Sequence, residues 1–171
     1  SVVGRDYYGV FPLKGKMLNV KDIKESKMQK NDEIKNLVKI LGLKYNEKYN
    51  FKQQGLWPLR YGKIMIMTDQ DHDGSHIKGL VMNLFHTYWG TLFENEFISC
   101  LVTPIVKCRK AKEELKFYTI PEYNCWKNSK TDKEIKSWKI KYYKGLGTSN
   151  VTEAKEYFKY LNTHSYIFDK D

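Results

Sequence analysis

The segment 64–80, "IMIMTDQDHDGSHIKGL", constrains the fold more than any other part of the chain. Its first four residues are all apolar, as expected of a strand that is covered on both faces and ends at Thr68. From His76 onward the apolar residues recur at helical spacing, at Ile77, Leu80, Val81, Leu84 and Tyr88. Three aspartates fall between the two patterns: Asp69, Asp71 and Asp73. They are predicted on a loop that joins a strand to a helix, and ligands bind at that edge of open α/β sheets.

These carboxylates crowd negative charge onto one side of the loop. Alternate residues of an extended chain lie about 6 to 7 Å apart, and at that distance two carboxylates repel by about 2.5 kcal/mol at an effective dielectric of about 20. The loop therefore needs a compensating cation or raised pKa values. Oxygen ligands without cysteine favour Mg²⁺ or a similar ion over Zn²⁺. The alternative is a solvated acidic turn in which Asp73 caps the helix.

Other motifs that the loop resembles fail on spacing. An EF-hand loop that began at Asp69 would need a bidentate Glu at its twelfth position, where the chain has Leu80. A Walker A loop fails in the same way, because apolar residues stand where Lys and Ser/Thr are required. A haloacid-dehalogenase phosphatase needs a downstream acidic pair for Mg²⁺, which the later aspartates do not supply. For His72 and His76, four residues apart, polar or phosphate contacts are favoured over a transition-metal site.

Length and composition bound the remaining possibilities. The 171 residues suffice for one compact domain with a small appendage. The chain lacks an apolar run of about 18 residues and a signal peptide, so we expect a soluble intracellular protein with no membrane partner. The formal charge of +10 indicates a polyanionic partner or a solvated basic surface. Three cysteines without C-x-x-C spacing are interpreted as buried free thiols.

Elsewhere, segments of strand and helix pattern alternate, which predicts an α/β layered domain. Asn31 or Asp32 is expected to cap a helix that Gly42 ends, and the segment 44–58 is expected to be a surface connection. We expect strands at 7–13, 97–108, 114–120 and 137–144, the last with a basic outer face, and a short helix at 121–128. Asn150 and Glu153 form a candidate capping pair for a last helix, whose apolar face comprises Ala154, Tyr157, Phe158 and Leu161.

Four motifs in this order, "VVGRDYYGVFPLKGKMLNV", "LRYGKIMIMTDQDHDGSHIKGL", "TPIVK" and "KYYKGLGTS", resemble the metal-binding TOPRIM region of eukaryotic-type DNA topoisomerase II. The resemblance covers nearly the whole chain. It implies a Rossmann-like layered α/β TOPRIM domain with a mainly parallel sheet and helices on both faces. We expect residues 1–120 to form the TOPRIM core, truncated at its N-terminus, and residues 121–171 to form an extension that leads toward a winged-helix DNA-binding domain.

The resemblance implies a magnesium-dependent isomerase that cuts both strands of a duplex, passes a second duplex and reseals the break. By motif, Asp69 bridges two metal positions, Asp71 completes the second, and Asp73 is an outer-sphere ligand or an organiser of the loop. Mn²⁺ or Ca²⁺ can substitute for Mg²⁺, and ATP binds a separate domain of the whole protein. In the family, the remaining metal ligand is a Glu upstream of these motifs and the nucleophilic Tyr lies downstream, so we expect this chain alone to be inactive.

The resemblance also implies where DNA would bind. Lys14, Lys16 and Asn19 match a segment that approaches DNA near the cleavage point. His76 and Lys144 match positions near the scissile phosphate and are the candidate catalytic residues. The implied partners are double-stranded DNA and the other domains of the same enzyme, in a nuclear homodimer, with this chain alone a monomer. Two alternatives stay open: a primase-like or nuclease TOPRIM domain, and a non-catalytic DNA-binding module.

Overall fold

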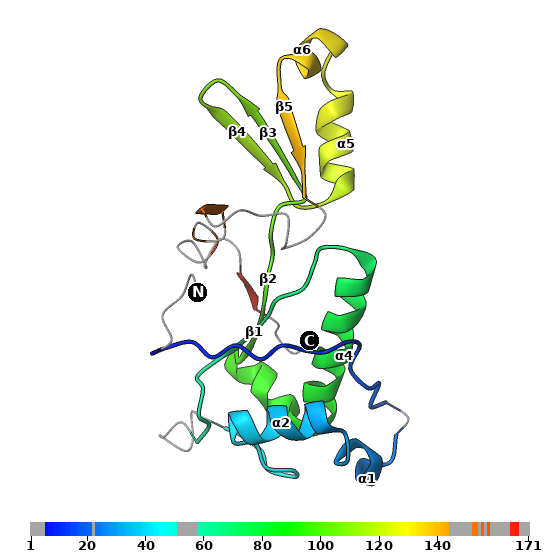
Figure 1. Cartoon of the computed structure of the whole chain (residues 1–171), viewed down its shortest axis with the longest axis vertical. Coiled ribbons are helices and arrows are strands. Elements are labelled where there is room, and N and C mark those ends of the chain that lie inside the picture. The colour runs from blue at the N-terminus through cyan, green and yellow to red at the C-terminus, as the bar shows by residue number, and fades with distance from the viewer. Residues whose placement is uncertain are drawn as a thin grey trace.

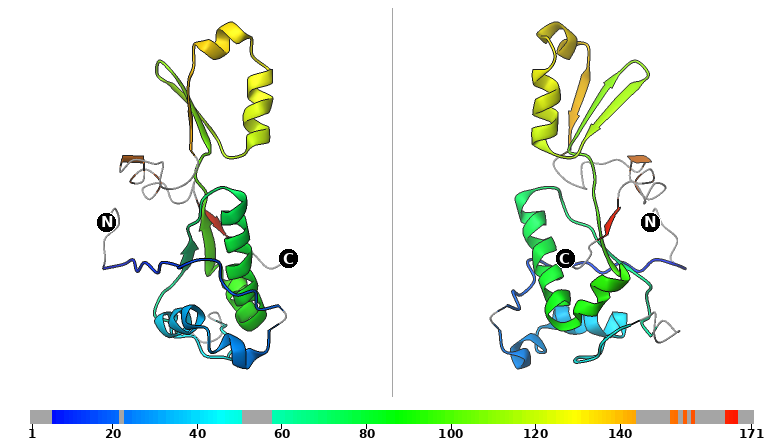
Figure 2. Two further views of the ribbon diagram at one scale, coloured as in Figure 1. Left: turned by 45° about the vertical axis from the view of Figure 1, so that its right-hand side comes forward. Right: turned by 180° about the vertical axis from the view of Figure 1, so that it is seen from behind.

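The computed structural model describes residues 6–21, 23–50, 58–143, 152, 153, 155, 157 and 165–167, and these form two lobes joined by the segment between β2 and β3 (Figures 1 and 2). The first lobe contains α1 (Glu25–Met28), α2 (Asp32–Leu41), β1 (Ile64–Ile66), α4 (His72–Trp89), the 3₁₀ helix η1 (Gly90–Asn95), β2 (Ile98–Leu101) and β6 (Ser165–Ile167). The second contains β3 (Val106–Lys110), β4 (Glu113–Phe117), α5 (Ile120–Asn128), α6 (Asp132–Lys136) and β5 (Lys139–Tyr142).

The sheet of the first lobe has the strand order β1-β2-β6. β1 and β2 are parallel, with Ile64 opposite Ile98, and α4 with η1 forms the crossover that a parallel pair requires. β6 adds to β2 in the antiparallel direction. The α/β layered prediction is confirmed, with β1 and β2 as the parallel pair and antiparallel pairing for the other strands that the structure describes.

The core of the first lobe lies where α4 and η1 pack against α2 and the sheet. Its fully buried side chains include Leu84, Phe85, Trp89, Leu92 and Ile98. The segment predicted as a surface connection contributes to this core, because the Tyr49 side chain is buried and its hydroxyl accepts a hydrogen bond from the Lys44 backbone N–H at 2.9 Å. That prediction is wrong at Tyr49, and residues 51–57 lie outside the described part of the chain.

The sheet of the second lobe is antiparallel throughout, in the order β4-β3-β5. One of its faces is apolar and packs on α5, with Val106, Cys108 and Tyr123 buried and the Phe117 and Tyr123 rings 5.6 Å apart. The helix predicted at 121–128 is confirmed as α5, which a Thr119 and Glu122 capping box opens. The strand expected at 97–108 proves to be two strands, β2 and β3, in different sheets.

The prediction of a strand at 7–13 is wrong. That segment follows an irregular path, and Tyr7 and Val10 remain exposed. The helix α2 is confirmed with both of its caps, since the Asn31 side chain accepts from the Ile34 N–H and Gly42 adopts a left-handed φ of 77°. Of the predicted last helix, Tyr157 is buried, whereas Asn150, Ala154, Phe158 and Leu161 lie outside the described residues.

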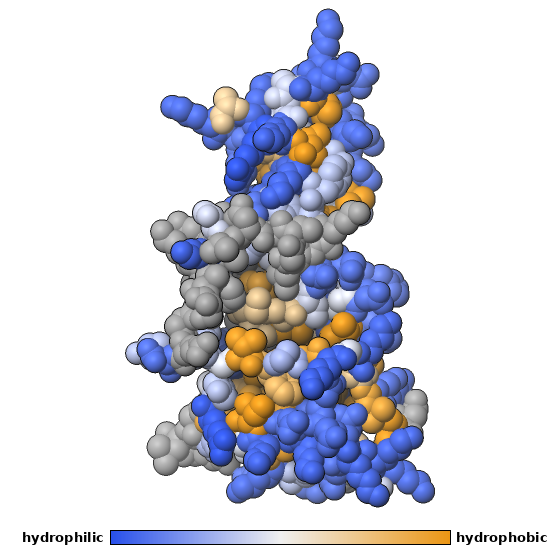
Figure 3. Space-filling model, viewed as in Figure 1, coloured by the Kyte–Doolittle hydropathy of each residue, from blue (hydrophilic) through white to orange (hydrophobic). Residues whose placement is uncertain are grey.

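Hydrophilic side chains cover most of the face that Figure 3 shows, and apolar side chains gather in the middle of the first lobe. Cys100 and Cys108 are buried free thiols as predicted, whereas Cys125 is exposed on α5. No helix in the described ranges combines the length and the apolar character needed to cross a bilayer.

Candidate metal site

The loop between β1 and α4 carries the aspartates, and Asp71 sets where the helix begins. Its carboxylate accepts a hydrogen bond from the Gly74 backbone N–H at 2.7 Å, which makes Asp71 the N-cap of α4. The helix therefore starts at His72, four residues before the predicted start, and Asp73 lies in its first turn rather than on the loop. Asp71, not Asp73, is the cap.

Gly74 brings this first turn against the preceding loop. The residue is buried, and a Cβ atom placed on it would lie 1.9 Å from the Asp69 carbonyl oxygen. Only glycine fits such an approach without moving the backbone. A second contact ties the loop to the neighbouring strand, because the Gln70 side-chain amide donates to the Leu101 carbonyl at 3.2 Å. The loop is thus fixed at the carboxyl ends of the parallel strands β1 and β2.

The basic segment 14–19 crosses α4 (Figure 1) and contacts the first turn of that helix. Lys16 Nζ is 3.0 Å from an Asp73 carboxylate oxygen, and both side chains are largely exposed. The hydrogen bond and the positive charge of Lys16 hold the pKa of Asp73 below its ordinary value. Further along, the Asn19 side-chain oxygen accepts from the Asn83 side chain of α4 at 3.3 Å.

The Lys14 backbone N–H donates to the Glu33 carboxylate of α2 at 2.7 Å, while the Lys14 side chain is exposed. The three predicted DNA-contact residues therefore share one segment that contacts α2 and α4. His76 is exposed in the second turn of α4, close to the loop, and Lys144 lies outside the residues that the structure describes.

The carboxylates share the site unequally. Asp71 is committed to the helix cap through one oxygen, and Asp73 is paired with Lys16. Within the described ranges, no group of three or more His, Cys, Asp or Glu side chains is arranged to hold a metal. Asp69 and Asp71 are both exposed on the loop, and their carboxylate oxygens are the candidate metal ligands. That pair fits Mg²⁺, which commonly uses one or two protein carboxylates and keeps several waters.

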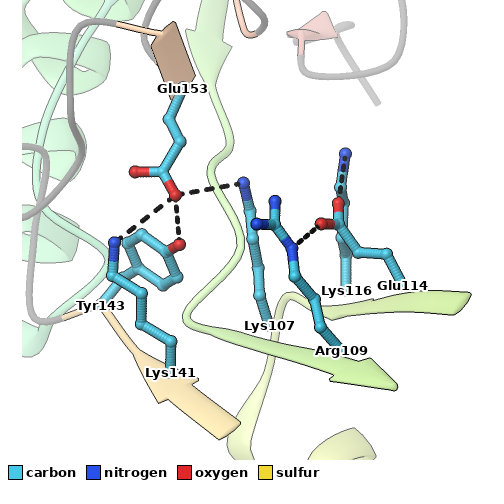
Figure 4. Close-up of polar contacts among 7 residues, drawn as sticks. All are labelled: Lys107, Arg109, Glu114, Lys116, Lys141, Tyr143 and Glu153. Atoms are coloured by element: carbon cyan, nitrogen blue, oxygen red, sulfur yellow. Dashed lines mark hydrogen bonds and ion pairs between the residues drawn. The ribbon is translucent and has the colours of Figure 1, made fainter. Parts of the chain in front are cut away.

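A second polar cluster, centred on Glu153, was missed from the sequence (Figure 4). Glu153 is buried, accepts a hydrogen bond from the Tyr143 hydroxyl, and lies 3.9 Å from Lys107 Nζ and 3.5 Å from Lys141 Nζ. Burial, followed by the hydrogen bond and the charge of Glu153, raises the pKa of Tyr143. The available signal was Lys107 in the apolar run "TPIVKC", because a buried lysine needs a partner.

Comparison with known families agrees with this fold and loop. The family model of the Toprim domain matches residues 1–105, and that of the C-terminal associated domain of TOPRIM matches residues 101–171. The chain belongs to the Toprim family. The expected division at residue 120 stays a prediction, and the packing of Phe117 on Tyr123 shows that both sides of it share one apolar cluster.

Within that family, the chain is similar to eukaryotic DNA topoisomerase 2, as its motifs indicated. It is 54% identical over 168 residues to DNA topoisomerase 2-beta of Homo sapiens, which covers 98% of this chain and 10% of the relative. It is 52% identical over 171 residues to DNA topoisomerase 2 of Drosophila melanogaster, which covers 100% of this chain and 12% of the relative.

Among solved structures, the DNA-binding, cleavage and re-ligation domain of Plasmodium falciparum topoisomerase II superposes with a TM-score of 0.84. The two are 50% identical, and the match covers 98% of this chain and 22% of that one. The chain spans 10 to 12% of the length of the curated relatives that it matches.

Proposed function

We propose that this chain is the metal-binding TOPRIM portion of an ATP-dependent type II DNA topoisomerase. The whole enzyme would make a transient double-strand break, pass a second duplex through it and religate the break. The observation that carries the proposal is the acidic loop at the carboxyl edge of β1 and β2, with the basic segment 14–19 fastened beside it through Lys16 and Asp73. Metal-dependent cleavage of a DNA phosphodiester needs carboxylates to bind the metal ion and nearby cationic side chains to bind the phosphates.

In this proposal Asp69 and Asp71 hold Mg²⁺, for which Mn²⁺ or Ca²⁺ can substitute. The bound ion supplies stabilisation of the negative charge that develops on the leaving 3′ oxygen. Asp73 acts as an organiser, since its carboxylate fixes Lys16 at the edge of the loop. Gly74 and the cap hydrogen bond hold Asp71 in place.

Double-stranded DNA is the proposed partner of the segment 14–19. Lys14 and Lys16 present exposed ammonium groups to phosphates, and Asn19 can contact the backbone of the duplex from its place beside α4. His76 and Lys144 are proposed to act near the scissile phosphate. The similarity to eukaryotic DNA topoisomerases 2 supports a nuclear, homodimeric whole protein with ATP bound in a separate domain.

A magnesium titration of three variants tests the site. Asp69→Asn and Asp71→Asn are expected to abolish the Mg²⁺-dependent shifts in the amide NMR signals of residues 69–76, because each removes one ligand charge. Asparagine caps a helix as well as aspartate does, so Asp71→Asn should leave the free energy of unfolding nearly unchanged. Asp132→Asn, on the exposed first turn of α6, is the control that alters only the net charge.

We expect weak binding by the unsubstituted chain, since two protein carboxylates leave most of the coordination to water. Tight Mg²⁺ binding that survives Asp69→Asn and Asp71→Asn would refute this ligand assignment. A chain that binds duplex DNA but never responds to Mg²⁺ would instead support the non-catalytic DNA-binding module. That second candidate is favoured by the lack of a three-carboxylate cluster among the described residues.

A further inference from the structure

The two faces of the sheet in the second lobe differ in character. Side chains alternate between the faces of a strand, so Val106 and Cys108 point to the apolar face under α5 while Lys107 and Arg109 point to the other. The pairing registers extend this second face across the sheet. Lys107 lies opposite both Lys116 and Lys141, and Arg109 lies opposite both Glu114 and Lys139. We call this surface, with Tyr143 and Glu153, the basic face.

The basic face juxtaposes like charges. A row of three lysines, Lys116, Lys107 and Lys141, crosses all three strands, and like charges directly opposite one another disfavour strand pairing. Within the described ranges, the face carries five cations against the two carboxylates Glu114 and Glu153, an excess of three positive charges. An arrangement that works against folding calls for a compensating anion.

Both carboxylates are already shared between cations (Figure 4). Glu114 bonds Arg109 and lies 3.5 Å from Lys116 Nζ. Glu153 contacts Lys107, Lys141 and Tyr143. The aromatic rings add further stabilisation of the ammonium groups, since Lys141 Nζ lies 4.5 Å from the Tyr143 ring centroid and Lys107 Nζ lies 5.3 Å from that of Tyr157. These contacts position the cations but do not remove their excess.

The cations surround a hollow rather than a flat surface. A pocket of about 250 Å³ is lined by Lys107, Arg109, Lys139, Lys141, Tyr143 and Glu153. Lys107 is only 2% exposed, so one ammonium group lies in the low-dielectric floor, where attraction to an anion is strongest. Lys139 and Lys141 line the pocket from β5, where both side chains are exposed.

We propose that this pocket is an anion-binding site that accepts a phosphate group, either free, as in pyrophosphate, or as part of a nucleic-acid backbone. Phosphate is favoured over a single carboxylate because a doubly charged group matches more of the excess positive charge. Its oxygens can accept hydrogen bonds from several of these cations, including the Arg109 guanidinium. The site lies in the second lobe and needs neither Asp69 nor Asp71, so it is separate from the proposed metal loop.

Pyrophosphate titration of the 171-residue chain, followed by amide NMR at constant ionic strength, tests the proposal. We expect saturable shifts at residues 107, 109, 139 and 141. The double variant Lys139→Gln/Lys141→Gln shortens each side chain by one atom, removes two positive charges from the wall of the pocket, and is expected to weaken binding by about tenfold or more. Lys133→Gln/Lys136→Gln, on the exposed α6 of the same lobe, makes the same change in net charge and should leave the affinity within about twofold.

A second arm distinguishes the source of the phosphate. A short DNA duplex that displaces pyrophosphate from the unsubstituted chain identifies a nucleic-acid backbone, and a duplex that leaves it bound identifies a free phosphate compound. Equal weakening in the two double variants, or equal shifts with KCl, would show simple charge screening and overturn the proposal. A hexaglutamate peptide that bound the same residues more tightly than pyrophosphate would overturn the choice of phosphate. Asp69→Asn leaves this pocket intact, so the two proposals are tested separately. Pyrophosphate binding can fail while the metal assignment stands, and the metal assignment can fail while pyrophosphate still binds.

Discussion

Gly74 and Asp71 together define the geometry of the acidic loop at the scale of single residues. Asp71 begins the helix with its side chain, and Gly74 lets the first turn approach the Asp69 carbonyl oxygen. The sequence pattern correctly placed Asp69 and Asp71 on the loop, but Asp73 lies in the first turn of α4. The pattern could not tell which aspartate caps α4, because Asp71 and Asp73 suit an N-cap equally by residue type, and only the structure shows that the Gly74 N–H donates to Asp71.

Gly74→Ala tests this close contact. A methyl group 1.9 Å from the Asp69 carbonyl oxygen forces the loop and helix apart, so we expect the free energy of unfolding to fall by about 3 kcal/mol. Gly79→Ala is the matched control in the same helix, because a methyl group there would meet no neighbouring atom within 4 Å and alanine favours helix by about 0.5 to 1 kcal/mol. Urea denaturation measures both. Equal effects of the two substitutions would contradict this account.

The Lys16 and Asp73 ion pair has a defined pH dependence. Because the pKa of Asp73 is lowered in the folded chain, the pair stabilises the fold above the ordinary carboxyl pKa of about 4, and the stabilisation is lost as the pH falls through the lowered value. Lys16→Gln is expected to return the pKa of Asp73 toward its ordinary value in an NMR titration, with Lys35→Gln as control. An unaltered pKa in Lys16→Gln would show that the pair does not form in solution.

At the scale of elements, the sequence predicted those helices and strands whose signals lie within a single segment of the chain. The caps of α2, the proline at the start of α5 and the alternation in β5 act within one segment, and all three elements were found. The strand predicted at 7–13 failed because a strand also needs a partner. The run 97–108 divides between two sheets near Pro104, which lacks an N–H for strand pairing. The sequence marks Glu153 only as a local cap candidate, whereas the fold buries it against β3 and β5.

The turn between β3 and β4 offers a prediction at this scale. Ala111 is the first of the two residues in this turn and has a φ of 51°. This left-handed conformation costs a non-glycine residue about 1 kcal/mol. Glycine adopts this conformation freely, so Ala111→Gly should raise the free energy of unfolding by about 0.5 kcal/mol after its entropy cost. Lys112→Gly relieves no left-handed backbone strain, so it should lower the free energy of unfolding. A loss of stability in Ala111→Gly equal to that in Lys112→Gly would contradict this interpretation.

On the scale of the whole molecule, the two lobes have separate apolar clusters and separate concentrations of charge. The acidic loop belongs to the first lobe, and the basic face belongs to the second. The sequence indicated the family through four ordered motifs spread along the chain. This recognition does not depend on predicting each helix or strand correctly. The sequence indicated the basic outer face of β5 but not the row that Lys107, Lys116 and Lys141 form, because strand register, not sequence spacing, places these three residues together.

The proposed function makes a prediction for the chain as a whole. With Mg²⁺ and ATP, the purified 171 residues are expected neither to cleave nor to relax supercoiled plasmid. The reason is that the family resemblance places the nucleophilic tyrosine in a downstream domain rather than in any motif matched here. Agarose gel electrophoresis of the plasmid, with an intact type II topoisomerase as positive control, measures this. Metal-dependent relaxation by the chain alone would refute that placement.

The Asp71 cap has a consequence for how a cation would be received. A side chain that folding has already fixed has lost its rotational freedom before any ion arrives, so binding does not have to order it again. The direction in which the Asp71 carboxylate points toward an ion would then depend on the axis of α4. This 18-residue helix is anchored in the core by Trp89. A small tilt of this helix would redirect the Asp71 carboxylate, so in the proposed metal site the packing around Trp89 would influence metal affinity from the far end of the helix.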